Sequence, residues 1–63
     1  MIVATFYRWL PSGDAEVATE DGDLLQVTAQ LLAASAFRRL RVGQRLAVKL
    51  SPTGIVISID LPN

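Results

Sequence analysis

The stretch Phe37-Arg38-Arg39-Leu40-Arg41-Val42-Gly43-Gln44-Arg45-Leu46 decides the fold of this 63-residue chain. It reads Phe-x-x-Leu-x-x-Gly-Gln-x-Leu, and Val42-Gly43-Gln44 within it is a turn signal. After the turn, every second residue from Leu46 to Leu50 is a large aliphatic residue. Because strand side chains alternate between two faces, residues 45–50 are predicted to form a strand with one buried face.

Upstream of this stretch, three segments carry strand patterns and are separated by turn signals. Strands are expected over residues 1–10, 15–19 and 24–27, which are rich in β-branched, aromatic or alternating residues. Pro11-Ser12-Gly13-Asp14 and Glu20-Asp21-Gly22-Asp23 supply the turns, because proline presets φ and glycine tolerates the left-handed region. The second turn contains an Asp-Gly pair, which is a strong hairpin signal.

Residues 28–41 change character, because alanine and leucine dominate and favour a helix. Thr28 is a plausible N-cap, and Ser35 is a candidate interruption. At least one helical turn is expected, and a helix reaching Phe37 fits the pattern. The apolar residues recur at helical spacing and predict one stripe, made of Ala29, Leu32, Ala33, Ala36, Phe37 and Leu40.

A last strand is expected after the turn Ser51-Pro52-Thr53-Gly54. Residues 55–61 alternate, which predicts that one set of side chains points inward and the other outward. The expected inward set is Ile55, Ile57, Ile59 and Leu61, and the expected outward set is Val56, Ser58 and Asp60.

The order of these elements predicts a single all-β domain over residues 1–63. Three strands, a short helical turn and two more strands are the order of a five-stranded Greek-key OB-like barrel. A split open sheet of ββ-β-α-ββ type is the competing arrangement.

The spacing Phe-x-x-Leu-x-x-Gly-Gln-x-Leu resembles the beginning of the fourth strand of cold-shock domains, OB-fold proteins that bind single-stranded RNA and DNA. The resemblance is good from Phe37 to Leu50 and moderate over the first three strands. Cold-shock domains carry stacking aromatics on strands two and three, and each stacked base contributes roughly 1–3 kcal/mol. This chain has Asp14, Glu16, Leu25 and Val27 there. The resemblance therefore implies a divergent member that lacks most of the stacking aromatics and binds nucleic acid weakly.

The binding residues implied by the resemblance are the aromatics that remain and the arginines beside them. They are Tyr7, Arg8, Trp9 and Phe37, with Arg38 and Arg39 contacting phosphates. Alternation predicts that Tyr7 and Trp9 lie on one side of their strand. Each feature has an alternative interpretation: Trp9 could cap the open end of the barrel, and Phe37 could pack into the core. The arginines could be a solvated face or a partner for the acidic segment of another copy.

Composition excludes several classes of function. The chain has no cysteine and no histidine, so disulfides, zinc knuckles, thiol nucleophiles and histidine bases are absent. The sequence contains no nucleophile–base pairing and no phosphate-binding glycine loop. The aspartates do not form a metal-ligand cluster, because their positions fit ordinary turns. The protein is therefore expected not to be an enzyme, and no metal, cofactor or small-molecule substrate is expected.

Charge and hydropathy bear on partners. Net charge is zero, with acids gathered between Asp14 and Asp23 and arginines between Arg38 and Arg45. Apolar residues make up 51% of a chain too small to bury them all, which favours a homodimer, another homo-oligomer or a protein partner. The alternative function is thus an OB-fold interaction module that has lost nucleic-acid binding. No membrane span or signal peptide is expected, and a cytoplasmic location is the default.

Overall fold

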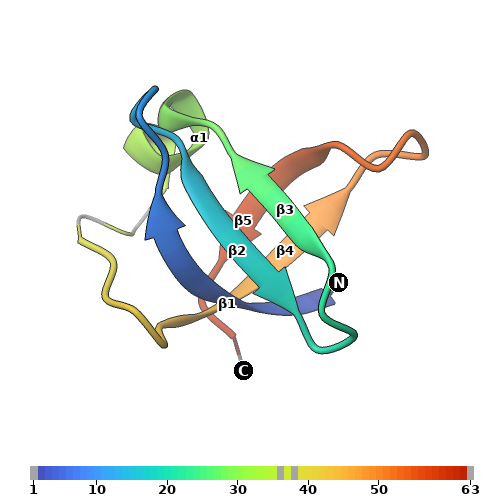
Figure 1. Ribbon diagram of the computed structural model, residues 1–63. Coiled ribbons are helices and arrows are strands. Elements are labelled where there is room, and N and C mark those ends of the chain that lie inside the picture. The colour runs from blue at the N-terminus through green and yellow to red at the C-terminus, as the bar shows by residue number, and fades with distance from the viewer. Residues whose placement is uncertain (1, 36, 38, 63) are drawn as a thin grey trace.

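The computed structural model of the chain describes residues 2–35, residue 37 and residues 39–62. Within them, five strands and one short helix follow one another in the expected order (Figure 1). The strands expected over 15–19, 24–27 and 45–50 have the predicted bounds, and the other two agree to within one residue at each end. The elements are β1 (Ile2–Trp9), β2 (Ala15–Thr19), β3 (Leu24–Val27), α1 (Ala29–Ala34), β4 (Arg45–Leu50) and β5 (Val56–Asp60).

The five strands form one antiparallel sheet in the order β3-β2-β1-β4-β5. This sheet curls into a half-barrel, and its two edge strands, β3 and β5, approach each other on the open side (Figure 1). Among the described residues no backbone hydrogen bond joins these two edges. The prediction of an all-β, barrel-like fold is confirmed at this level.

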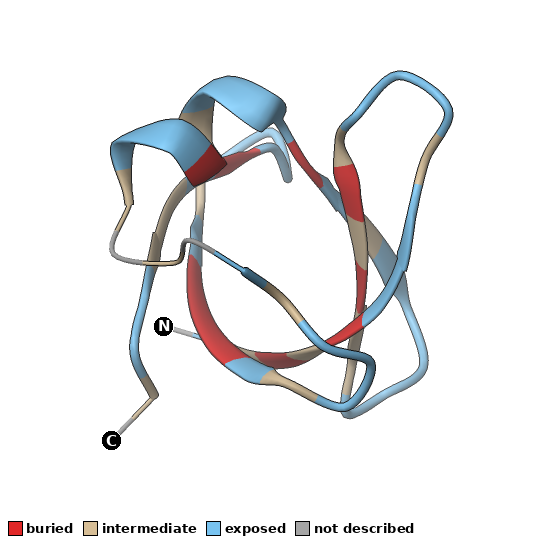
Figure 2. Cartoon of the chain, turned by 90° about the vertical axis from the view of Figure 1, so that its left-hand side faces the viewer, coloured by how far each residue is buried: buried red, intermediate tan, exposed pale blue. Residues whose placement is uncertain are grey.

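The core is made of buried residues from every strand and from α1. Figure 2 colours the buried positions red along the chain. Phe6, Leu46 and Val48 lie at the centre of the core, on the neighbouring strands β1 and β4. The inward face predicted for β4 is confirmed, because Leu46 and Val48 are fully buried and Leu50 packs half-buried against the core. The other face is not wholly exposed, because Ala47 is buried as well. The other members of the core are Ala4, Ala15, Val17, Val27, Leu32 and Val56.

A bulge in β5 makes the predicted inward face of that strand wrong. Leu50 pairs with Val56 but Lys49 pairs with Ser58, so Ile57 is an extra residue in β5. A bulge shifts the alternation by one residue. Val56, expected outside, is therefore 4% exposed, whereas the residues expected inside are exposed with one exception. Ile55 and Ile57 are exposed for this reason, and Ile59, beyond the bulge, packs against the core as predicted. Leu61 is also exposed, but it lies past the end of β5.

The helix α1 is a short capped helix of six residues that stops before Phe37. Thr28 caps its start, because the Leu31 N–H donates to the Thr28 Oγ1 at 3.3 Å. Ser35 ends it: the Ser35 hydroxyl donates to the Leu32 carbonyl at 2.8 Å and accepts from the Phe37 N–H at 3.1 Å. Both the predicted cap and the predicted interruption are confirmed. No helix among the described residues is long and apolar enough to cross a membrane.

The predicted apolar stripe is only partly buried. Leu32 is buried, and Phe37 and Leu40 are half-buried against the core. Ala29 and Ala33 are exposed, so the prediction was wrong for these two residues. Ala36 lies outside the described residues.

The Gly-Gln turn ties the linker to the central strand. The Gln44 N–H donates to the Arg41 carbonyl at 2.8 Å, and Gly43 has a φ of 94°. A positive φ at the third residue of such a turn strongly favours glycine. Phe6 bonds to both residues after Val42: its N–H donates to the Gln44 carbonyl at 2.7 Å, and its carbonyl accepts from the Gly43 N–H at 3.1 Å.

We expect Gly43→Ala to lower the free energy of unfolding by about 1–2 kcal/mol, the cost of a left-handed conformation for a residue with a Cβ. An added Cβ would meet no atom within 4 Å, so the loss would be conformational and not steric. Urea denaturation followed by Trp9 fluorescence measures it. Val42→Ala, at a neighbour that is 78% exposed, is the control and should change stability by no more than about 0.5 kcal/mol. Equal effects from the two variants would contradict this reading of the turn.

Candidate nucleic-acid interface

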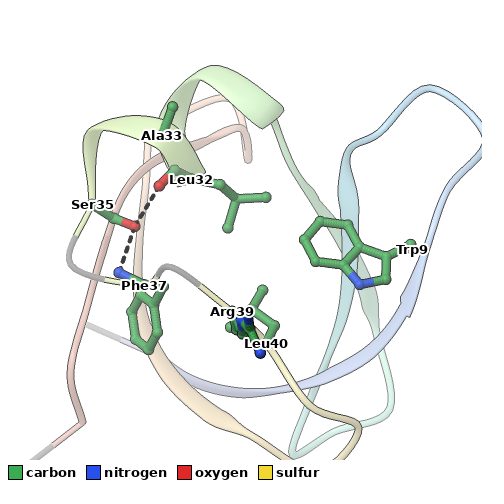
Figure 3. A pocket seen from close by; sticks show the side chains of 7 residues that line it. All are labelled: Trp9, Leu32, Ala33, Ser35, Phe37, Arg39 and Leu40. Atoms are coloured by element: carbon green, nitrogen blue, oxygen red, sulfur yellow. Dashed lines mark hydrogen bonds between the residues drawn. The ribbon is translucent and has the colours of Figure 1, made fainter.

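A cavity opens at the end of the half-barrel beside α1, and we call it the mouth cavity. Its volume is about 340 Å³. Figure 3 shows Trp9 on one side of it, facing the helix and the segment that follows the helix. The cavity brings together three predicted binding residues, Trp9, Phe37 and Arg39. Its remaining lining residues are Leu32, Ala33, Ser35 and Leu40.

A bulge in β1 turns Trp9 toward this cavity. Phe6 pairs with Val17 but Arg8 pairs with Glu16, so Tyr7 is the extra residue. Beyond the bulge Trp9 pairs with the buried Ala15, on the same side of the sheet as Phe6. The prediction that Tyr7 and Trp9 share one side of the strand is therefore wrong, because simple alternation does not continue through a bulge.

Trp9 lies at the end of the core, as the capping interpretation of the sequence predicted. Its ring lies 5.2 Å from the Phe6 ring, centroid to centroid, with the planes tilted by 59°. This is a favourable aromatic geometry and fixes the indole at the end of the core. Trp9 nevertheless remains 51% exposed, so the residue that caps the core keeps part of its ring surface open to solvent.

The wall of the cavity opposite Trp9 is formed by the end of α1 and by residues that follow it. Phe37 is half-buried, packs against the core and donates its backbone N–H to the Ser35 hydroxyl. Leu40 is half-buried beside it, and Arg39, between the two apolar residues on the wall, is exposed. A short run of chain thus presents an aromatic ring and a guanidinium to one cavity. Arg38 lies outside the described residues.

Tyr7 and Arg8 lie together on the outer face of the sheet and do not line the mouth cavity. The Arg8 Nε donates to the Glu16 carboxylate at 2.7 Å, and its guanidinium carbon lies 5.9 Å from the centre of the Tyr7 ring. The hydrogen bond from Arg8 to Glu16, and then the charge of that carboxylate, raise the pKa of Arg8. The structure therefore divides the predicted binding residues between two surfaces.

The arginine cluster is divided as well. Arg45 donates to the Glu20 carboxylate at 3.1 Å, joining β4 to the hairpin between β2 and β3. Both side chains are largely exposed, so this ion pair contributes little to stability. Part of the acidic segment thus finds its basic partner within the same chain. Arg39 and Arg41 form no ion pair with the acids that the structure describes.

Asp14 has a structural role that the sequence analysis did not predict. One carboxylate oxygen accepts from the Ala29 N–H at 2.8 Å and the other from the Gln26 side-chain amide at 2.6 Å. The bond from Ala29 and then the bond from Gln26 lower the pKa of Asp14. The register of the hairpin between β2 and β3 could have indicated this role. Because Ala15 pairs with Val27, Asp14 lies beside the residues that begin α1.

Among the described residues, no group of three or more histidine, cysteine or acidic side chains is placed to hold a metal ion. Comparison of the chain with protein-family models, curated proteins and solved structures found no match. The resemblance to cold-shock domains therefore rests on the residues quoted above.

Asp14 should make stability depend on pH in the acid range. Its pKa is lower in the folded chain, so its contribution is complete above the ordinary carboxyl pKa of about 3.9 and is lost as pH falls through the folded value. Asp14→Asn should lower the melting temperature at pH 7, and the difference from the original chain should shrink below about pH 3.5. Circular dichroism melts measure both.

The control for this experiment is Asp21→Asn, which changes an exposed acid in the second hairpin. It should leave the melting temperature at pH 7 nearly unchanged. A loss for Asp14→Asn that stays constant from pH 7 to pH 2.5 would contradict the assignment to the ionised carboxylate.

Proposed function

We propose that the protein is a divergent, cold-shock-like OB module that binds single-stranded RNA or DNA weakly. Two features support the fold part of the proposal. The strand order with a short helix between β3 and β4 fits a five-stranded Greek-key barrel. The Gly43–Gln44 turn, on which the family resemblance depends, is bonded to the central strand at Phe6.

The observation that carries the binding proposal is the meeting of Trp9, Phe37 and Arg39 at the mouth cavity. Proteins bind single strands by stacking bases on aromatic rings while cations contact the backbone phosphates. Here two aromatic residues and one arginine line the same cavity from separate parts of the chain (Figure 3). A ligand that carries a base and a phosphate could stack its base on the aromatic rings and bind its phosphate to the arginine.

Weak binding follows from what surrounds the cavity. The chain has no net charge, whereas phosphate neutralisation supplies much of the affinity of nucleic-acid binders. Strands β2 and β3 carry no aromatic residue, and Glu16 on β2 is paired with Arg8. The face that would hold most bases in a cold-shock domain is therefore unsuited to them.

Binding is tested by titrating a single-stranded oligonucleotide of about twelve nucleotides at low salt while following the fluorescence of Trp9, the only tryptophan. We expect quenching, with dissociation constants of tens of micromolar or weaker. Arg39→Glu should weaken binding roughly tenfold, because it replaces the phosphate contact by a repulsion. The matched control is Arg41→Glu, which reverses an exposed arginine outside the cavity and should change affinity less than about threefold.

Absence of quenching in the original chain would refute the proposal. Equal losses in the two arginine variants would place binding elsewhere on the surface.

A second function, self-association or docking of a protein partner, is favoured by the open side of the half-barrel. Between the edge strands lies a neutral cavity of about 430 Å³, which we call the seam. Leu24 and Ile55 line it and are 55% and 63% exposed. Its other lining residues are Leu25, Gln26, Thr28, Gly54 and Val56. Unpaired strand edges with exposed aliphatic side chains are sites where another chain can pair.

Light scattering over a range of concentrations tests this second function. If the seam joins two copies, the average mass should rise with concentration, and the double variant Leu24→Gln/Ile55→Thr should remain a monomer. Val42→Thr is the control, because Val42 is 78% exposed and does not line the seam. A chain that is monomeric at every concentration, before any substitution, would refute the self-association form of this function.

A further inference from the structure

The size of the mouth cavity limits what can occupy it. Its volume of about 340 Å³ is at the small end of the roughly 300–1,000 Å³ of small-molecule sites. Single-stranded nucleic-acid grooves on OB folds, by contrast, hold about 4–16 nucleotides along an extended surface. The volume of the cavity therefore matches one small ligand better than several nucleotides of a strand.

The number of aromatic residues at the cavity is also sufficient to stack only one base. Trp9 and Phe37 are the aromatic residues that line the cavity. Phe6 lies behind Trp9 and is 2% exposed, so it offers no ring surface to a ligand. Tyr7 lies on the outer face with Arg8. A base in the cavity has aromatic neighbours, whereas the next base along a strand has none within the described residues.

The polar side chains of the lining select an anion rich in hydrogen-bond acceptors. Arg39 and Trp9 carry N–H donors, and neither group is an acceptor. The Ser35 hydroxyl already donates its hydrogen to the Leu32 carbonyl. No residue of the lining is acidic. Base carbonyls and a phosphate match this set, whereas a cationic or donor-rich ligand does not.

Among the described residues of the lining, the single cation implies contact with one phosphate. Arg39 is the charged residue at the cavity among the residues that the structure describes, and Arg45 is paired with Glu20 on another part of the surface. A guanidinium can bind one phosphate through two parallel hydrogen bonds. A second phosphate further along a strand would find no second guanidinium among the described residues that line the cavity.

We infer that the mouth cavity is a single-nucleotide site: it takes one unpaired base between Trp9 and the Phe37 wall, and Arg39 binds that nucleotide's own phosphate. This inference rests on the proposed function and narrows it. An oligonucleotide is held by one nucleotide, and the rest of the strand stays in solvent.

A length series tests the inference. The probes are uridine 5′-monophosphate and oligouridylates of two, four, eight and twelve nucleotides, with affinity read from Trp9 fluorescence. We expect the mononucleotide to bind, and affinity per nucleotide to stay constant within about twofold along the series. Uridine and inorganic phosphate, each alone, should bind at least about tenfold more weakly, because each loses either the charged contact or the stack.

Salt dependence gives a second readout. For the eight-nucleotide probe, the plot of log affinity against log salt should have a slope of about −0.7, the value for one phosphate contact on a single strand. Arg39→Gln should flatten that slope, and the control Arg41→Gln should leave it unchanged. Phe37→Leu, which keeps an apolar side chain in the wall, should weaken mononucleotide binding at least about fivefold without flattening the slope.

The outcomes separate this inference from the broader proposal. Oligonucleotides that bind with steeply rising affinity per nucleotide and a slope near −3, while the mononucleotide does not bind, would overturn the single-site inference and leave nucleic-acid binding standing. Absence of binding by any probe would overturn both. Mononucleotide binding that survives both Arg39→Gln and Phe37→Leu would place the site elsewhere and overturn the inference.

Discussion

Phe6 is the residue on which the rest of the molecule depends. Its backbone joins the central strand to the Gly43–Gln44 turn through two hydrogen bonds, so it sets where β4 begins. Its side chain is buried at the centre of the core and supports the ring of Trp9. One residue therefore connects the turn that directs the fold to the aromatic wall of the mouth cavity. A change that displaced Phe6 would disturb the sheet and the cavity together.

Much of the fold could be predicted from local sequence, because local signals agree with one another. The hairpin turns contain proline or aspartate followed by glycine, and the segments between them alternate, so β2 and β3 have their predicted bounds. The cap at Thr28 and the stop at Ser35 are likewise short-range hydrogen-bonding effects. Such features depend on residues only a few positions apart in the chain, so they can be predicted from a single sequence.

The bulges at Tyr7 and Ile57 could not be predicted in this way, and they explain the main errors. A bulge is a property of two paired strands, whereas alternation is read along one strand. The same limit applies to Asp14, whose partners at Gln26 and Ala29 are defined only by strand pairing. At the candidate site, the sequence indicated Trp9, Phe37 and Arg39, but only the fold shows that these residues meet while Tyr7 and Arg8 lie elsewhere.

The most direct test of the account is a map of backbone and indole amide chemical shifts by nuclear magnetic resonance, recorded with and without a single-stranded oligonucleotide. The account predicts that the largest changes fall at the Trp9 indole and at residues around the mouth cavity, including Leu32, Phe37 and Arg39. Changes concentrated on β2 and β3, with the Trp9 signal unmoved, would contradict it.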